Sequence, residues 1–162
     1  MMYVNVRAII ERNYNNYSEI VIQTRTKNNE PIVYELPGGQ LNEYESLLSC
    51  LKREVMEETG LEITSIVNEN SKIISKSEIY KTEVECMESF AVYQTTYGPI
   101  DSMGIYFRCN ATGQILIEGD GTKEIRWIRL EDLYKLIQDD IEKFSWVDRV
   151  GIQFYLNKVG FI

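Results

Sequence analysis

The sequence predicts an α/β fold in which a mixed β-sheet is covered by helices on both of its faces. Segments with the alternating pattern of β-strands lie both before and after one amphipathic helical segment, at residues 42–59. From Leu130 onward the apolar residues change to helical spacing. Because each sheet face must be covered, this order favours helix, sheet and helix layers in one domain, residues 1–162.

The strands are expected on both sides of the central helix. Residues 2–10 and 18–26 are rich in alternating apolar side chains around a polar connection, which predicts a hairpin. Further strands are expected at residues 32–36, 61–67, 90–97, 105–109 and 125–128. Within residues 68–90 we expect a turn at 68–71 and short strand pieces at 73–74 and 78–80.

The central helix carries signals at both ends. Asn42 and Glu45 have the spacing of a capping box, and Gly60 stands where a left-handed residue ends a helix. Between them an apolar arc follows one helix face, formed by Tyr44, Leu47, Leu48, Leu51 and Val55. The helical repeat places Glu58 inside this arc, so a carboxyl group is expected where an apolar side chain is usual.

Three acids near the end of this helix share one side of it. Glu54, Glu57 and Glu58 are spaced i, i+3 and i+4, so their like charges repel one another. They also lie at the helix C-terminus, where the helix dipole disfavours anions. A hard divalent cation such as Mg²⁺ or Mn²⁺ would make this arrangement favourable, because it binds carboxylate oxygens. The alternative is a solvated acidic helix whose glutamates pair with Lys52 and Arg53.

A longer motif contains these acids. Gly39, Glu45 and the run from Arg53 to Leu61 have the spacing G-x5-E-x7-R-E-U-x-E-E-x-G-U, where U is aliphatic, and they follow Pro37-Gly38. In every defining position this segment resembles the Nudix box. The resemblance implies a Nudix-type α/β/α sandwich with a mixed central β-sheet, and the order of elements predicted above agrees with it.

The resemblance also implies an activity. It implies a Nudix pyrophosphohydrolase, that is, a metal-dependent hydrolase of nucleoside diphosphate-linked substrates, with nucleoside triphosphates or related nucleotides as the expected substrates. Hydrolysis of ADP-ribose or of dinucleoside polyphosphates is an alternative. A second alternative is a non-catalytic nucleotide-binding module, although such modules generally have damaged boxes. An isoprenoid diphosphate isomerase and a structural protein are further alternatives; the absence of histidine argues against the isomerase.

By the same resemblance, the metal ligands are Glu54, Glu57 and Glu58, with the Gly38 carbonyl as an additional ligand and Mg²⁺ or Mn²⁺ as the ion. Arg53 is expected to orient the acids by pairing with Glu57 or Glu45. Either Glu54 or Glu124 would accept a proton from the attacking water.

Residues outside the helix complete the expected site. By the resemblance, an acid before a tryptophan-bearing strand serves as a further metal ligand or as the base; Glu124 in segment 118–124 is the first choice, with Glu118 and Asp120 behind it. The alternative for each of these three acids is a solvated turn. The resemblance implies that Arg25 reaches a substrate phosphate and that Gly39 allows close approach of the backbone. The alternative for Arg25 is a surface arginine that neutralises local acids.

Composition excludes several classes of function. The net charge of −8 argues against a broad surface for duplex nucleic acid. The absence of histidine removes serine–histidine and cysteine–histidine nucleophilic schemes and histidine-bound zinc. The three cysteines contain no CxxC pair, so free thiols are expected. No apolar run reaches the length of a membrane span and the start lacks a signal-peptide layout, so we expect a cytoplasmic protein without a membrane partner.

Two helices are expected at the C-terminal end. Leu133, Leu136, Ile137 and Ile141 form the apolar stripe of the first. Ser145 and Asp148 have N-cap spacing for the second, whose inward residues would be Val147, Val150 and Phe154. The last residues, 158–162, are mostly apolar, so we expect them to dock on the domain or on a second subunit, which would make a homodimer.

Overall fold

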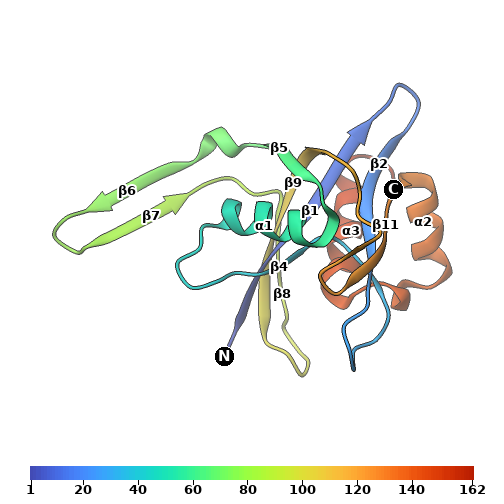
Figure 1. The fold of residues 1–162 in the computed structure, drawn as a ribbon, viewed down its shortest axis with the longest axis horizontal. Coiled ribbons are helices and arrows are strands. Elements are labelled where there is room, and N and C mark those ends of the chain that lie inside the picture. Colours follow the sequence, from blue (N-terminus) through green and yellow to red (C-terminus); the bar gives the residue numbers. More distant parts are fainter.

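The computed structural model describes residues 1–162 as a curled mixed sheet between two helical layers (Figure 1). The strands of the main sheet are β1 (Tyr3–Asn13), β2 (Ser18–Arg25), β3 (Tyr34–Glu35), β4 (Gly38–Gln40), β5 (Glu62–Ile66), β8 (Ala91–Gln94), β9 (Ser102–Thr112), β10 (Glu118–Gly119) and β11 (Thr122–Arg129). The helices are α1 (Leu47–Thr59), α2 (Leu130–Asp139) and α3 (Trp146–Lys158), with short 3₁₀ turns η1 (Glu69–Ser71) and η2 (Ile141–Lys143). No helix has both the length and the apolar character that crossing a membrane requires.

The sheet is mixed, as the sequence predicts. Its strand order is β10-β11-β2-β1-β9-β5, and only β1 and β9 pair in parallel, at the centre of the sheet. The short strands β3, β4 and β8 pair with β2, β1 and β9 in antiparallel fashion. The pairing of β4 with β1 places Gly38 opposite Arg7 and Gly39 opposite Val6.

Each face of the sheet has its own hydrophobic core. Alternate residues of β1 point to opposite faces, so Val6, Ala8 and Ile10 pack with α1, while Ile9 packs with α2 and α3. The α1 core includes Leu51. These two cores confirm the α/β/α layering.

The end of α1 is predicted correctly, but its start is not. Gly60 is left-handed with φ 77°, and its N–H donates to the Met56 carbonyl. The N-cap is Ser46, whose hydroxyl accepts a hydrogen bond from the Ser49 N–H, so the helix begins at Leu47 rather than after Asn42. The preceding residues form a turn in which Tyr44 has a positive φ and is fully exposed, so its assignment to the apolar arc is wrong.

The inward face of α3 is predicted only in part, because Val147 packs against the core as expected but the other two residues do not. Val150 and Phe154 are 50% and 43% exposed, whereas Asp148 is fully buried against Arg7 and does not cap the helix. Ile141, expected at the end of the preceding apolar stripe, lies in η2 instead. The tertiary ion pair of Asp148 therefore decides which side of α3 faces the sheet.

A hairpin stands apart from the main sheet. β6 (Ile73–Ser77) and β7 (Thr82–Cys86) pair only with each other. Figure 1 shows them projecting outward from the molecule on the side opposite to α2 and α3. Residues 78–80, expected to be a strand piece, belong to the turn between β6 and β7.

Candidate active site

Two glycines bring the chain before α1 against β1 and the acids. At Gly38, which has φ 149°, a Cβ atom would lie 2.1 Å from the Val6 carbonyl oxygen. At Gly39, a Cβ atom would lie 2.4 Å from the carboxyl carbon of Glu54. Any larger residue would therefore push β4 away from β1 or displace the Glu54 side chain.

Glu58 is the most deeply buried acid of α1, with 5% of its surface exposed. One of its carboxyl oxygens, Oε2, accepts hydrogen bonds from the Gly38 N–H at 2.9 Å and from Gln23 Nε2 at 2.8 Å. Burial raises the pKa of Glu58 to about 8, against the opposing effect of Arg7 and with a further contribution from nearby Glu35. Its expected place inside the apolar arc is thus observed, and near neutral pH the protonated form is favoured in the metal-free protein.

A buried polar network extends from Glu58 to α3. Gln23 Nε2 also donates to Glu35 at 3.1 Å, and Glu35 lies 3.6 Å from the Arg7 guanidinium. Arg7 in turn donates to both carboxyl oxygens of Asp148, at 2.8 and 2.5 Å. Burial opposes the charge of Arg7, but Asp148 and Glu35 together keep its pKa above the ordinary value. The network links α1 to α3 through the sheet.

The sequence interpretation did not identify Gln23, Glu35, Arg7 or Asp148. A signal was available at Arg7, which shares a strand face with the buried Ile9 and so puts a charge at an apolar position. Gln23 gave no such signal, because the residues that follow it in its strand, Thr24 and Arg25, are also polar. A buried charge on a strand requires a partner from another element.

Arg53 forms hydrogen bonds with the other three acids of the motif. Its guanidinium donates to both oxygens of Glu45, at 2.7 and 2.9 Å, to Glu54 at 2.7 Å and to Glu57 at 3.3 Å. The hydrogen bond from Arg53 holds the pKa of Glu45 down at about 2. Through Arg53, Glu45 therefore joins the segment before α1 to the second turn of the helix.

The acids of α1 fit a divalent cation by their chemistry. They supply several carboxylate oxygens from adjacent helical turns, which is the donor set that Mg²⁺ and Mn²⁺ prefer. No three acidic or cysteine side chains converge on one point in this structure. Glu54 and Glu57 are turned to Arg53, and Glu58 is turned to Gly38 and Gln23. Metal binding would thus compete with hydrogen bonds that these carboxylates already make.

Residues 116–122, up to the first residue of β11, cover the C-terminal end of α1. The N–H groups of Leu116 and Asp120 donate to the carbonyls of Thr59 and Glu57, and the Thr122 hydroxyl donates to the Glu58 carbonyl. These donors satisfy helix carbonyls that would otherwise lack partners. Their partial positive charges also offset the unfavourable helix dipole at the acids.

Glu124 lies on the strand that follows this segment. Its carboxylate accepts a hydrogen bond from the Thr24 hydroxyl at 2.8 Å, and its backbone has a positive φ of 52°. Glu118 and Asp120 are exposed. The structure thus places Glu124 beside Thr24, the neighbour in sequence of Gln23, whose amide binds Glu58.

A cleft of about 750 Å³ opens beside the buried network. Its lining includes three arginines, Arg7, Arg25 and Arg149, and three aromatic residues, Tyr3, Phe144 and Trp146. Arg25 forms ion pairs with Glu30 and, at 3.3 Å, with Glu35. Both interpretations of Arg25 therefore have support: it neutralises local acids, and it borders a cleft that a polyanion could enter.

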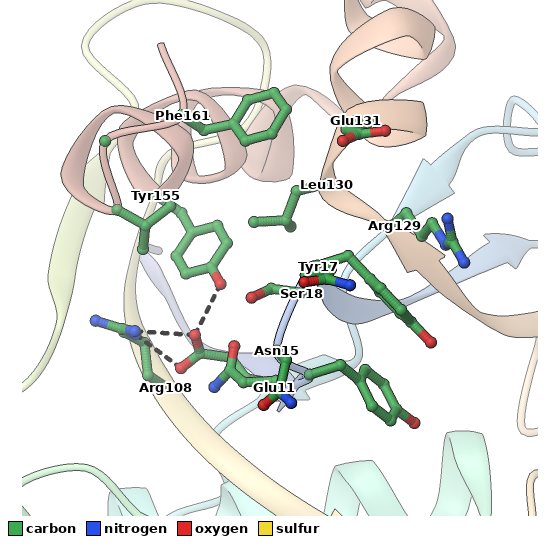
Figure 2. Close-up of a pocket in the computed structure, with 15 residues that line it drawn as sticks. Glu11, Asn15, Tyr17, Ser18, Arg108, Arg129, Leu130, Glu131, Tyr155 and Phe161 are labelled. Atoms are coloured by element: carbon green, nitrogen blue, oxygen red, sulfur yellow. Dashed lines mark hydrogen bonds and ion pairs between the residues drawn. The ribbon is translucent and has the colours of Figure 1, made fainter.

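A second hollow of about 450 Å³ lies at the other end of the same sheet face (Figure 2). At its base Glu11 is held by Arg108, at 2.7 and 2.9 Å, and by the Tyr155 hydroxyl at 2.7 Å. At its rim the Arg129 guanidinium lies 4.1 Å from the centre of the Tyr17 ring. The Glu11 carboxylate at the base of this hollow therefore already has a counter-charge, Arg108, and a hydrogen-bond donor, Tyr155.

The model of the NUDIX domain family matches residues 2–150. None of the curated proteins matches this sequence significantly.

Solved structures share the fold at low identity. One is the NUDIX domain of Shewanella oneidensis NrtR complexed with ADP ribose, with TM-score 0.66 and 14% identity over 98% of this chain and 89% of that one. Another is a MutT NUDIX hydrolase from Burkholderia pseudomallei, with TM-score 0.61 and 16% identity over 94% and 97%. A third is a MutT/nudix family protein from Enterococcus faecalis, with TM-score 0.59 and 16% identity over 80% of this chain. This chain spans only 44% of the length of the third protein.

Proposed function

Because the chain belongs to the NUDIX domain family, we propose that it is a Mg²⁺-dependent hydrolase that cleaves the pyrophosphate bond of nucleoside diphosphate derivatives. The observation that carries the proposal is the placement of Glu58, buried at the end of α1 and held by the Gly38 N–H at 2.9 Å. Burying an acid beside two more acids at the same helix end costs stability. Such costly, perturbed groups are concentrated at functional sites.

We assign the cation to Glu54, Glu57 and Glu58, with the Gly38 carbonyl as an additional ligand. A dication held there supplies a Lewis acid that neutralises phosphate charge and makes water a better nucleophile. Mn²⁺ offers the same chemistry and is the expected substitute for Mg²⁺.

The residues of the chain orient these groups. Arg53 fixes Glu54 and Glu57 relative to Glu45. Gly39 leaves room for the Glu54 carboxylate next to the backbone. A proton from the attacking water passes to Glu54 or to Glu124. Comparing the pH–rate profiles of Glu54→Gln and Glu124→Gln distinguishes the two, because loss of the base removes the acidic limb of the profile.

We propose that the cleft of about 750 Å³ receives the substrate. Arg25 and Arg149 would bind its phosphates, since guanidinium groups pair well with phosphate oxygens. Trp146 is 46% exposed at the cleft and offers a face on which a base can stack. The expected substrates are nucleoside triphosphates or related nucleotides. ADP-ribose is the second candidate, because a Shewanella NUDIX domain with the same fold was crystallised with it.

The test is Mg²⁺-dependent hydrolysis of a panel of substrates. Release of phosphate or pyrophosphate is measured for simple nucleotides, and chromatographic separation of the nucleotide products, AMP among them, for ADP-ribose and dinucleoside polyphosphates. Glu57→Gln should lower kcat by about 100-fold or more, the scale seen when a charge-stabilising group is removed. Glu62→Gln is the matched control, because Glu62 is exposed on β5, just beyond α1. Near-normal turnover by Glu57→Gln would contradict the assignment. Nucleotide binding without turnover by the wild-type chain would favour the non-catalytic module.

A further inference from the structure

The hairpin of β6, β7 and their turn, residues 73–86, is here called the arm. Its two strands pair in register from Ile73 opposite Cys86 to Ser77 opposite Thr82. Neither strand pairs with the main sheet, and no arm residue belongs to either hydrophobic core. Figure 1 shows the arm projecting away from the rest of the molecule. The arm therefore has no packing partner within the chain.

The arm has two different faces, because directly opposed residues of a hairpin share a face and alternate residues change face. One face, here called the neutral face, carries no acidic or basic side chain and consists of Ile73, Ser75, Ser77, Thr82, Val84 and Cys86. The other face carries Lys76 and Glu83, which pair at 3.1 Å, and Glu85, which pairs with Lys72 at 3.5 Å. The arm is thus amphipathic at strand spacing.

The neutral face leaves large apolar side chains in water. Ile73 and Val84 are 71% and 61% exposed, and Ile79 and Tyr80 at the tip are 87% and 79% exposed. A two-stranded hairpin with no third strand or helix against it is only marginally stable in water. An amphipathic hairpin is stabilised when its apolar side is covered, so these exposures indicate a partner.

Charge limits the approach of a second copy of the chain to the neutral face. Two copies, each with a net charge of −8, repel each other over most of their surfaces. The neutral face is where they can approach without bringing fixed charges together. A basic partner, by contrast, would be attracted to the acidic surfaces and would gain nothing electrostatically from this face.

The order of side chains along the arm favours a second copy as the partner. Apolar residues lie at the root (Ile73), the centre (Val84) and the tip (Ile79 and Tyr80). When a second arm runs in the opposite direction across a two-fold axis, root meets tip and centre meets centre. Apolar groups then face apolar groups along the whole arm, which is the self-complementarity that a two-fold interface requires.

We propose that the chain forms a reversible two-fold dimer in which the neutral faces of the two arms pack against each other. Each face is about 17 Å long at ~3.4 Å per residue and about 10 Å wide for two strands, so the two arms with their tips bury less than ~1,000 Å² in total. This area lies at the lower end for specific interfaces, so the dimer dissociates on dilution. The proposal does not depend on the proposed hydrolase activity.

The test is the molar mass in solution over a dilution series, by sedimentation velocity or light scattering. The wild-type chain should pass from twice 18.9 kDa toward 18.9 kDa on dilution. Val84→Lys should remain monomeric at concentrations where the wild type is dimeric, because it places two like charges at the centre of the contact. Ser75→Lys, directly across the hairpin on the same face, should have the same effect.

Ile74→Lys is the matched control. It also adds a lysine to the arm, but on the charged face and opposite Glu85, so the dimer should persist. Circular dichroism and cooperative unfolding show whether each variant is folded. The rate of Cys86 alkylation gives a local measurement, since Cys50 and Cys109 are buried and Cys86 is exposed on the neutral face. Alkylation should be slower in the dimeric forms than in Val84→Lys.

Three outcomes would overturn the proposal. One is a wild-type mass of 18.9 kDa throughout the dilution series. Another is a dimer that survives both Val84→Lys and Ser75→Lys, which would place the contact elsewhere. The third is equal loss of the dimer in Ile74→Lys. A monomer whose arm binds uncharged lipid vesicles would show that a membrane surface, and not a second copy, covers the neutral face.

Discussion

The end of α1 and the arm depart from the usual distribution of residues in opposite ways. At α1, ionisable groups are buried: Glu58, Arg7 and Asp148 are each at most 5% exposed, and each has a charged or hydrogen-bonding partner. On the arm, Ile73 and Val84 are more than half exposed and have no partner in the chain. Burying charge and exposing apolar surface both cost stability. Each region thus indicates a function that involves another molecule.

The two regions differ in how firmly the chain itself holds them. The polar network is fixed by side chains from β1, β2, β3, α1 and α3, so removal of one member leaves other charges buried and unpaired. The arm is fixed by its own ladder and by a few surface ion pairs, so a change there affects little beyond the arm. The predictions below test this contrast, from the largest expected effect to the smallest.

The largest effect is expected at Arg7. Arg7→Met leaves Asp148 and Glu35 buried without their cation, so the free energy of unfolding should fall by about 3–5 kcal/mol. Urea denaturation measures the change. Arg12→Met, in the same strand but removing a partly exposed pair with Glu19, should cost about 1 kcal/mol or less. Equal losses in the two variants would mean that the network is not the stabilising element proposed here.

A smaller effect, per pH unit, is expected from pH. Because burial raises the pKa of Glu58 from 4.5 to about 8, the folded metal-free protein keeps a proton that the unfolded chain releases. This contribution to stability is fully present below pH 4.5 and is lost as the pH rises through 8. In that window the free energy of unfolding should fall by at most about 1.4 kcal/mol per pH unit from this group.

The measurement compares urea denaturation of wild type and Glu58→Gln in the presence of a chelator at several pH values. The free energy of unfolding of the wild type should fall relative to that of Glu58→Gln as the pH rises from 4.5 to 8, since glutamine does not titrate. A difference that is constant from pH 5 to 8 would show that Glu58 is ionised in the folded state.

The smallest effect is expected on the arm. In the Val84→Lys background, where the chain should be monomeric, Ile79→Ser should change the free energy of unfolding by less than about 0.5 kcal/mol, because Ile79 is 87% exposed. Ile9→Val, in the core under α2 and α3, should cost about 1 kcal/mol in the same background. A larger loss from Ile79→Ser would mean that the tip packs on its own chain.

Predictions that depend on neighbouring residues in the sequence were mostly correct. The hairpin of β1 and β2 follows from two alternating segments around a polar connection. Gly60 ends α1 because a left-handed residue is needed at that point. The start of α1 was missed because Asn42 and Ser46 both carry N-cap side chains, and the positive φ of Tyr44 decides between them.

Predictions that depend on distant residues were less reliable. Val150 and Phe154 fit the apolar stripe of a helix, yet Asp148 is the residue that faces the sheet, since Arg7 from β1 provides its counter-charge. Gln23 reads as an ordinary strand residue until Glu35 and Glu58 converge on its amide. No local pattern contains these pairings, which join residues far apart in the chain.

By itself the sequence determined the family motif and the burial of Glu58, because both follow from spacing within one segment. It also determined the layered α/β fold, because that follows from the order of strand and helix patterns along the chain. The pairing of Arg53 with Glu45 and Glu57 was predicted from the motif, and the structure adds Glu54. Only the tertiary structure decided that Glu58 meets Gln23, that Arg7 meets Asp148 and that the arm stands free. These features depend on which segments meet when the sheet closes. Packing of the whole chain sets that, since no single segment contains both partners.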